Sequence, residues 1–152
     1  MKLRPAHTTD GPLLLAWRND PAARLMSLDQ RDISRKEHEA WLAAKLQSED
    51  SEIWIGVADG RPVGQVRFDL LEDGVAVVSI AVAHAARGRG HGRRLLLAGI
   101  ERQRLSLRTL RAQVRPENEA SLKLFQGCGF CETSRSDASV TLERRATRPT
   151  GR

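Results

Sequence analysis

The chain has 152 residues and a net charge of +6, and its length suits a single domain in which helices cover both faces of a sheet. No run approaches the eighteen apolar residues of a membrane span and the N-terminus has no secretory leader, so we expect a cytoplasmic protein that does not enter a membrane. The two cysteines cannot build a disulfide framework, and the basic balance suits a small anionic ligand, nucleic acid or ribosome association equally well.

The first third of the chain predicts a strand and two helices. Residues 2–6 form the strand, and a helix that begins at Asp10 and Pro12 ends at residues 19–21. Ser34 and Glu37 have the spacing of a capping box. The helix that they begin places five residues on one face: His38, Trp41, Leu42, Lys45 and Leu46.

The middle third predicts strands at residues 53–58 and 63–70, a turn at residues 72–74 and a central strand at residues 75–83. A glycine-rich loop follows and leads into an amphipathic helix over residues 92–104. The last third predicts a strand at residues 110–114, a helix that Asn118 caps and Gly127 ends, and a closing hairpin at residues 130–134 and 139–144. We therefore expect one domain over residues 1–144, followed by a disordered basic tail at residues 145–152.

The glycine-rich loop is the most informative segment. Gly88, Gly90 and Gly92 let the backbone turn sharply and expose N–H groups at the start of a helix, which favours a bound phosphate. Arg93 stands where a dinucleotide fingerprint needs its third glycine, and no Gly-Lys-Ser or Gly-Lys-Thr of a P-loop is present. The loop therefore predicts an anion site of another kind.

Two blocks resemble the motifs of the GNAT N-acetyltransferases. Arg87, Gly90 and Gly92 match motif A, which has Gln or Arg, two residues, Gly, one residue, and Gly or Ala. Residues 114–130 resemble motif B and follow motif A at the usual distance. The resemblance implies an α/β (α+β) GNAT fold, with one mixed sheet of about six to seven strands, splayed at the cofactor site and flanked by about four helices.

The resemblance also implies an enzyme that transfers an acetyl group from acetyl-CoA to an amine. The end of the central strand and the loop would bind the pantetheine and the pyrophosphate, and the capping Asn would reach the pantetheine arm. The implied cofactor-binding residues are Ile80, Ala81, Val82, Arg87, Gly88, Arg89, Gly90, His91, Gly92, Asn118 and Ser121.

The chain departs from the family pattern in its proton-transfer groups. Many members protonate the leaving thiolate with a Tyr in motif B, but Phe125 fills that position and the chain contains no Tyr. Residues 75–83 also lack the Glu that often relays the amine proton. The remaining candidates for a catalytic base are His38, Asp69, Glu72 and Asp73. An acceptor amine with a pKa near about 8 suits such a weak base better than a lysine-like amine near about 10.4.

The amino-terminal half resembles acetyltransferases that act on UDP-linked 4-amino-sugars in pseudaminic acid biosynthesis. The resemblance rests on residues 17–20, on residues 33–38 with Trp41, and on the strand at residues 64–68. A tryptophan could stack on uracil or a sugar, and arginines could pair with the diphosphate. The implied substrate-binding residues are Trp17, Arg18, Asn19, His38, Trp41 and Arg67.

Other functions remain open at this point. A protein N-terminal acetyltransferase of the ribosomal type or a small-amine acetyltransferase would need acidic residues, and Glu72 with Asp73 is the one such cluster near the loops. A non-catalytic acyl-CoA-binding module would explain the missing Tyr. An RNA-binding module would need exposed aromatic residues, of which the chain has few. The tryptophans could be core residues, and Cys128 with Cys131 lacks the second pair that a zinc site needs, so we predict no metal. A homodimer remains open.

Overall fold

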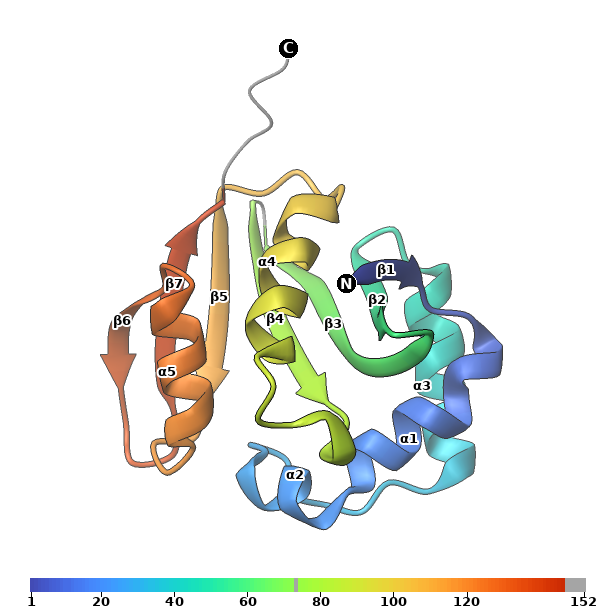
Figure 1. The fold of residues 1–152 in the computed structure, drawn as a ribbon. Helices are drawn as coiled ribbons and strands as arrows, with labels where there is room; N and C mark the ends of the chain where they lie inside the picture. The colour runs from blue at the N-terminus through green and yellow to red at the C-terminus, as the bar shows by residue number, and fades with distance from the viewer. Residues whose placement is uncertain (73, 147–152) are drawn as a thin grey trace.

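The computed structural model describes residues 1–72 and 74–146, which form a twisted sheet with helices on both faces (Figure 1). The strands are β1 (Lys2–Pro5), β2 (Ser51–Ala58), β3 (Arg61–Glu72), β4 (Val75–Val82), β5 (Thr109–Val114), β6 (Cys131–Arg135) and β7 (Val140–Arg145). The helices are α1 (Gly11–Asn19), α2 (Pro21–Met26), α3 (Arg35–Gln47), α4 (His91–Arg102) and α5 (Glu119–Gly127), with 3-10 turns at Thr8–Asp10 and His84–Ala86. Within the described ranges, no helix is long and apolar enough to cross a membrane.

The strands form one seven-stranded sheet in the order β1-β2-β3-β4-β5-β7-β6. Strands β4 and β5 are parallel and α4 connects them, whereas the other neighbouring strands are antiparallel. This mixed sheet confirms the predicted fold class.

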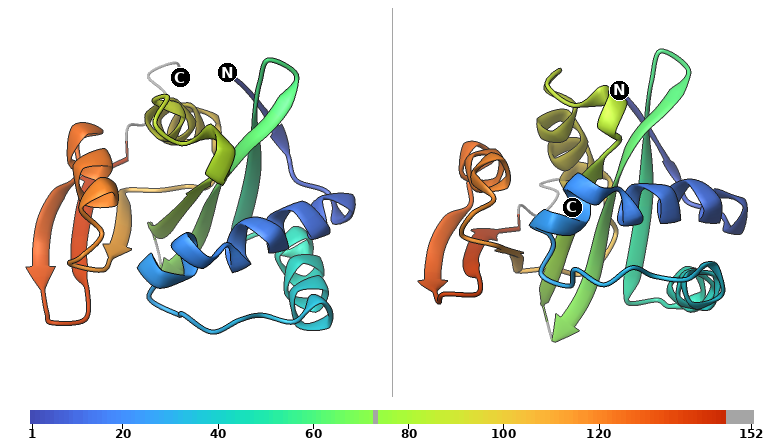
Figure 2. Two further views of the ribbon diagram at one scale, coloured as in Figure 1. Left: turned by 60° about the horizontal axis from the view of Figure 1, so that its bottom comes forward. Right: turned by 90° about the horizontal axis from the view of Figure 1, so that it is seen from below.

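The two faces of the sheet carry separate cores, because alternate residues of a strand point to opposite faces. Helices α4 and α5 cover one face and α1 and α3 lie on the other (Figure 2). The first face buries the larger core, which includes Phe68, Leu95 and Phe125. The second face packs Leu14 and Leu42 of the helices against Ile55 of β2. A side chain on β3 or β4 therefore belongs either to the α4 side or to the α1 and α3 side.

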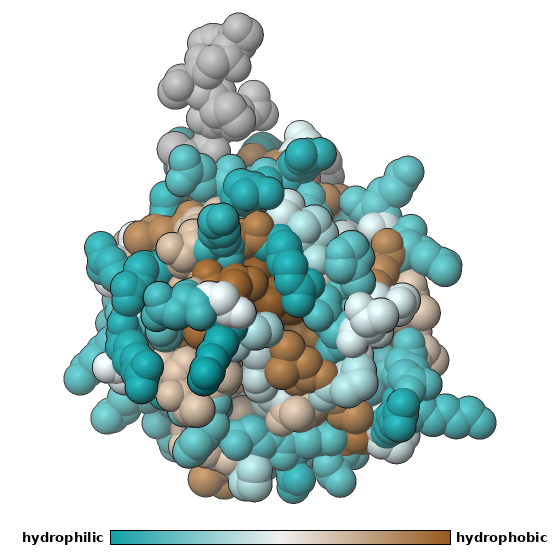
Figure 3. Space-filling model, turned by 45° about the vertical axis from the view of Figure 1, so that its right-hand side comes forward, coloured by the Kyte–Doolittle hydropathy of each residue, from teal (hydrophilic) through white to brown (hydrophobic). Residues whose placement is uncertain are grey.

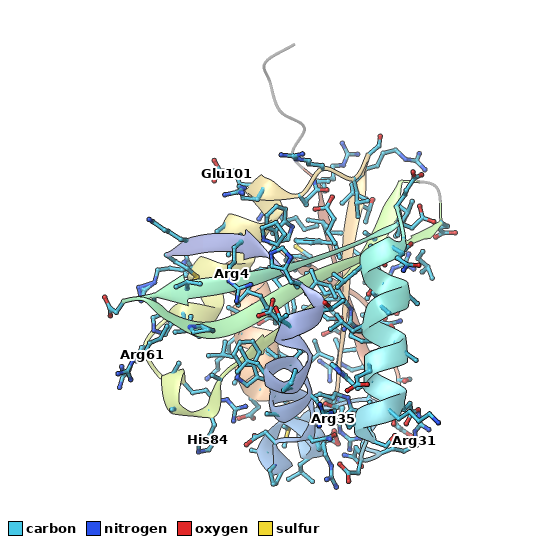
Figure 4. The ribbon with its side chains drawn as sticks, turned by 90° about the vertical axis from the view of Figure 1, so that its right-hand side faces the viewer. Arg4, Arg31, Arg35, Arg61, His84 and Glu101 are labelled. Carbon is cyan, nitrogen blue, oxygen red and sulfur yellow. The ribbon has the colours of Figure 1, made fainter. Side chains whose placement is uncertain are left out.

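An ion pair fixes the first strand to the first helix. The guanidinium of Arg4 on β1 donates two hydrogen bonds of 2.8 Å to the carboxylate of Asp10, the residue before α1. Figure 4 shows Arg4 directed toward the start of this helix. Arg4 holds the pKa of the buried Asp10 carboxyl below its usual range, so the pair is ionised at neutral pH.

The β4–β5 pair opens along its length. Val75, Ala76 and Val77 pair with residues of β5, and this pairing stops at Val77 although β4 continues to Val82. Figure 1 shows the ends of the two strands moving apart beside α5. Among the described residues, backbone groups of the last part of β4 that face β5 consequently have no strand partner on that side. The sheet is therefore splayed beside the loop that follows β4, as predicted.

Most predicted elements occur within two or three residues of their expected bounds, with three differences. Helix α2 was not predicted, and it begins at Pro21, within the residues predicted to end α1. Gly127 is the last residue of α5 and Gly129 has the positive φ of 90°, so Gly127 is not the C-terminal cap. Strand β7 extends to Arg145, one residue into the predicted tail, and residues 147–152 lie outside the described residues.

Candidate active site

The loop between β4 and α4 has the backbone geometry of an anion site. Gly88 and Gly90 have φ angles of 79° and 77°, which side-chain-bearing residues rarely adopt. Gly90 is the N-cap of α4, so the first N–H groups of the helix have no partner within it. Among the described residues, no acceptor is assigned to the N–H groups of residues 88–93. These donors and the positive end of the helix dipole fit a pyrophosphate.

His91, the first residue of α4, adds an unsatisfied side-chain atom to this loop. Its Nδ1 is buried and has no hydrogen-bond partner among the described residues. A buried polar atom without a partner is uncommon in folded proteins and suggests a missing ligand or water. The predicted cofactor residues at positions 88–92 therefore lie together, with backbone N–H groups and one imidazole nitrogen that have no partner among the described residues.

Two arginines beside the loop are held by backbone carbonyl groups. Nη2 of Arg94 donates to the carbonyl oxygen of Arg89 at 2.7 Å, which closes the loop on the first turn of α4. Nη1 of Arg93 donates to the carbonyl oxygen of Gly127 at 3.2 Å and joins α4 to the end of α5. Arg89 itself is exposed. Arg89 is therefore the better placed of the three to move toward a bound anion.

Arg87, the first predicted cofactor residue of the loop, contacts the end of β4, the 3-10 turn and the start of α2. Its Nε donates to the carbonyl oxygen of Val82 at 3.1 Å, at the end of β4. Its Nη2 donates to the carboxylate of Asp20 at 3.4 Å, and its Nη1 lies 3.3 Å from Nδ1 of His84. The guanidinium is thus turned back to the end of β4 and to α2, and it fixes the start of the loop.

The motif B residues lie on α5, next to the splayed strands. Oδ1 of Asn118 accepts the N–H of Ser121 at 3.2 Å, so Asn118 caps the helix as predicted. Its Nδ2 is thereby left to donate elsewhere. Phe125 is 3% exposed and packs edge-on against Phe130, with 5.0 Å between the ring centroids. The residue at the position of the usual acid is therefore part of the hydrophobic core.

The predicted acceptor residues lie on the face that α1 and α3 cover, and three of them are in direct contact. The rings of His38 and Trp41 lie 5.3 Å apart, and the guanidinium of Arg67 lies 4.9 Å from the centre of the Trp41 ring. Burial lowers the pKa of His38, and the positive charges of Arg18 and Arg67 lower it further. The imidazole is therefore neutral at pH 7 and stands in a positive field.

Asp69 lies in the same region and is fully engaged. It accepts 2.7 Å hydrogen bonds from Nζ of Lys45, Oγ of Ser51 and Nε of Arg67. Burial raises the pKa of its carboxyl, but these donors and the Arg67 charge outweigh burial and leave the pKa below its usual range. Arg67 also donates to Oγ of Ser79 at 3.3 Å. Asp69 is thus a fixed anion that holds Arg67, and it is poorly suited to act as a base.

Arg18 and Asn19, at the end of α1, contact the segment between α2 and α3. Both polar atoms of the Asn19 amide bond the backbone of Ile33, at 2.8 and 3.1 Å, so this side chain holds the segment in place. Nη2 of Arg18 donates to the carbonyl oxygen of Asp29 at 2.8 Å, whereas its Nη1 is buried without a partner among the described residues. Trp17 packs against the core of the same face.

Glu72, the base candidate at the end of β3, lies elsewhere. Glu72 pairs with Val75, at the closed end of the β4–β5 pair, and its carboxylate lies 4.0 Å from the guanidinium of Arg111. The cofactor loop follows the other end of β4, so the structure does not bring Glu72 to it. Asp73 lies outside the described residues.

A cavity of about 300 Å³ opens between α1 and α3, lined by Gly11, Pro12, Leu15, Ala16, Asn19, Arg35, His38 and Glu39. None of these residues belongs to β4 or to the cofactor loop, so the cavity is separate from the anion site. Figure 3 shows hydrophobic residues near the middle of one face of the molecule, surrounded by hydrophilic ones. Arg35 lies at the N-terminal end of α3 in Figure 4.

Three residues near the site were not singled out from the sequence as binding groups. Ser79 is the one polar residue in the apolar run of β4, and this break in the pattern could have indicated it. Asp20 was assigned to a helix end and to the resemblance at residues 17–20, and His84 was given no role. No sequence pattern indicates that these two residues lie beside Arg87.

Comparisons with known proteins agree with this fold. The spermidine N-acetyltransferase of Vibrio cholerae, solved with CoA and spermine, is 17% identical, with a TM-score of 0.85 over 95% of each chain. The ribosomal-protein-alanine N-acetyltransferase of Brucella melitensis is 24% identical, with a TM-score of 0.80 over 95% of this chain and 99% of its own. An N-acetyltransferase of Staphylococcus aureus Mu50 is 24% identical, with a TM-score of 0.81 over 96% and 98%.

None of the curated proteins matches the sequence. Residues 15–130, however, match the family described as the acetyltransferase (GNAT) family. This range begins in α1 and ends after α5, and it contains the glycine-rich loop, the splayed strands and the Asn118 cap. The chain therefore belongs to the GNAT acetyltransferase family.

Proposed function

We propose that this acetyltransferase moves the acetyl group of acetyl-CoA to a primary amine on an acceptor that also carries an anionic group. We further propose that this acceptor is a UDP-linked 4-amino-deoxy sugar. The observation that carries the proposal is the cationic surface on the α1 and α3 side of the sheet, where Lys45 and Arg67 bind one engaged carboxylate, Asp69, and the charges of Arg18 and Arg67 act on His38.

The donor part of the proposal rests on the loop that follows β4. The N–H groups of residues 88–93, which have no acceptor within residues 1–72 and 74–146, match the negative oxygens of a pyrophosphate. The unpaired edge of β4 offers backbone groups to the amide-containing arm of coenzyme A. When bound, acetyl-CoA supplies the thioester that the amine attacks, and this chain's residues hold and orient it.

The acceptor part rests on charge and on an unsatisfied donor. Nη1 of Arg18 is buried and has no partner among the described residues, and a diphosphate oxygen would satisfy it. Arg67 is held in one orientation by Asp69, Ser79 and the Trp41 ring, so a contact with a phosphate would require little further ordering. A polyamine or a cationic peptide would be repelled by the same groups.

We assign the proton-accepting role to His38. Its imidazole is buried and neutral at pH 7, as a general base must be before it accepts a proton. The positive field that keeps it neutral also disfavours the protonated form of a nearby amine. Both effects suit an amine of low pKa better than a lysine side chain.

Thiol release from acetyl-CoA tests the proposal. The assay compares a UDP-4-amino-4,6-dideoxy sugar, a basic peptide with a free N-terminus, spermidine and no acceptor. We expect release with the sugar, and we expect Arg67→Gln to raise its KM about tenfold, because the variant loses a charge-assisted hydrogen bond. The matched control is Arg61→Gln at the β2–β3 turn, which lies far from Arg35 and α3 in Figure 4 and should leave KM unchanged.

Release with the peptide or spermidine alone would overturn the nucleotide-sugar assignment. It would instead support a protein N-terminal or small-amine acetyltransferase; two proteins of similar fold are named as a spermidine and a ribosomal-protein-alanine N-acetyltransferase. If the protein binds acetyl-CoA but releases no thiol with any of the acceptors, this result would favour the non-catalytic acyl-CoA-binding function.

A further inference from the structure

Asp20 connects two parts of the molecule that the chain keeps far apart. It lies between α1 and α2 and is the N-cap of α2, where its Oδ2 accepts the N–H of Ala23 at 3.1 Å. The same carboxylate faces the start of the cofactor loop. Oδ2 accepts from Nη2 of Arg87 at 3.4 Å, and Oδ1 lies 4.0 Å from Nδ1 of His84. Asp20 and Arg87 are separated by 67 positions in the sequence.

Arg87 completes this connection on the side of the cofactor loop. Its backbone N–H donates to the carbonyl oxygen of His84 at 3.3 Å, and its Nε donates to the carbonyl oxygen of Val82. One side chain therefore joins the end of β4, the 3-10 turn and the first turn of α2. The N–H groups that have no acceptor in the described part of the chain begin at the next residue, Gly88.

Asp20 carries a full charge at neutral pH. The N–H of Ala23 is the largest cause that lowers the pKa of its carboxyl, and the charges of Arg87 and His84 add to it. The contact with Arg87 is therefore a charge-assisted hydrogen bond in addition to the helix cap.

We propose that Asp20 is a positioning residue for acetyl-CoA, because it holds Arg87 and thereby pre-orders the loop that binds the pyrophosphate. A loop with glycines at positions 88, 90 and 92 has much conformational freedom to lose when it binds a ligand. Fixing its first residue beforehand removes part of that loss. Because linkage is reciprocal, acetyl-CoA that immobilises the loop also steadies α2. This inference rests on acetyl-CoA as the donor and does not depend on the acceptor.

Asp20→Asn is the sharpest test, because asparagine caps helices as well as aspartate and the variant loses only the charge. We expect the Kd for acetyl-CoA, measured by calorimetry, to rise about fivefold, which is the lower end of common coupling between linked sites. In hydrogen exchange, acetyl-CoA should slow the amides of residues 22–26 in the original protein and should not slow them in the variant. Asp29→Asn is the matched control, because Asp29 lies in the following segment and pairs with Arg31.

A double-mutant cycle with Arg87→Gln separates positioning from folding. If Asp20 acts through Arg87, the double variant should bind acetyl-CoA no more weakly than Arg87→Gln alone. Unchanged affinity and preserved α2 protection in Asp20→Asn would overturn the inference and leave Asp20 as a helix cap. Tighter binding would also overturn it, because Asp20 would then compete with the pyrophosphate for Arg87. Failure of every protein to bind acetyl-CoA would instead contradict the donor assignment.

Discussion

Arg67 and Asp69 lie two residues apart on β3, on the same face of the sheet, and Nε of Arg67 donates to Oδ2 of Asp69 at 2.7 Å. Alternation along a strand puts both side chains under α3, where Lys45 and Ser51 reach the other carboxylate oxygen. Asp69, a candidate base in the sequence, therefore holds the guanidinium of Arg67 in place.

Asp69→Asn tests that support. The variant loses the anion between two cations, so we expect a free energy of unfolding about 2 kcal/mol lower and a higher KM for the acceptor. Denaturant melts and initial rates measure the two effects. Glu143→Gln is the control, because Glu143 makes a similar 2.7 Å contact with Arg111 in a different strand pair. If both variants change KM alike, Asp69 does not orient Arg67 for binding.

His38 predicts how stability depends on pH. Its pKa is lowered in the folded protein from an ordinary value of 6.5, so the unfolded chain binds the proton more strongly. The stability that the neutral imidazole contributes is present above pH 6.5 and is lost as the pH falls toward the lowered pKa. We expect His38→Gln to reduce the slope of stability against pH below 6.5, by at most about 1.4 kcal/mol per pH unit. Melts from pH 7.5 to pH 5 measure this slope, and equal slopes would contradict the prediction.

Gly90→Ala tests the cofactor loop against a matched glycine. Gly90 and Gly60 have φ angles of 77° and 76°, and an added Cβ has room at both. Each substitution should therefore cost about 1–2 kcal/mol of backbone strain. We expect the variant at position 90 to lose affinity for acetyl-CoA in calorimetry and the variant at position 60 to keep it. Unchanged affinity of the Gly90→Ala variant for acetyl-CoA would show that the loop is not part of the cofactor site.

Phe125→Tyr tests the absence of the usual acid. Phe125 packs against Phe130 in the core, and a hydroxyl there needs a hydrogen-bond partner, so we expect a loss of about 1 kcal/mol in stability. Affinity for acetyl-CoA should be unchanged, and turnover should stay within about threefold of the original. A tenfold gain, which equals about 1.4 kcal/mol of barrier, would show instead that a missing proton donor limits the reaction.

The sequence predicted the strands and long helices because hydrophobic periodicity and caps are local signals. The missed helix α2 has such a signal in Asp20-Pro21, which is a favoured pair at the N-cap and first position, but the same residues were read as the end of α1. The direction of β4 could have excluded Glu72, since that residue precedes the strand and the loop follows it.

The side-chain partners in the candidate site were not predictable in this way. Asn19 was assigned to substrate, yet it bonds Ile33, and Asp69 was a candidate base, yet three donors hold it. Arg87 bonds a residue 67 positions away. Such pairings depend on the packing of elements that are distant in sequence, which neither composition nor spacing records.

Because β4 diverges from β5, the stability of the fold should report whether a ligand occupies the opening between the two strands. A sheet that lacks hydrogen bonds along one strand gains them when an extended, amide-containing molecule enters the opening. Any molecule that binds there and prefers the folded state raises the unfolding temperature in proportion to the logarithm of its concentration. Melting curves alone can therefore screen acyl-CoA donors, and the coupling of an acceptor to its donor, without any turnover.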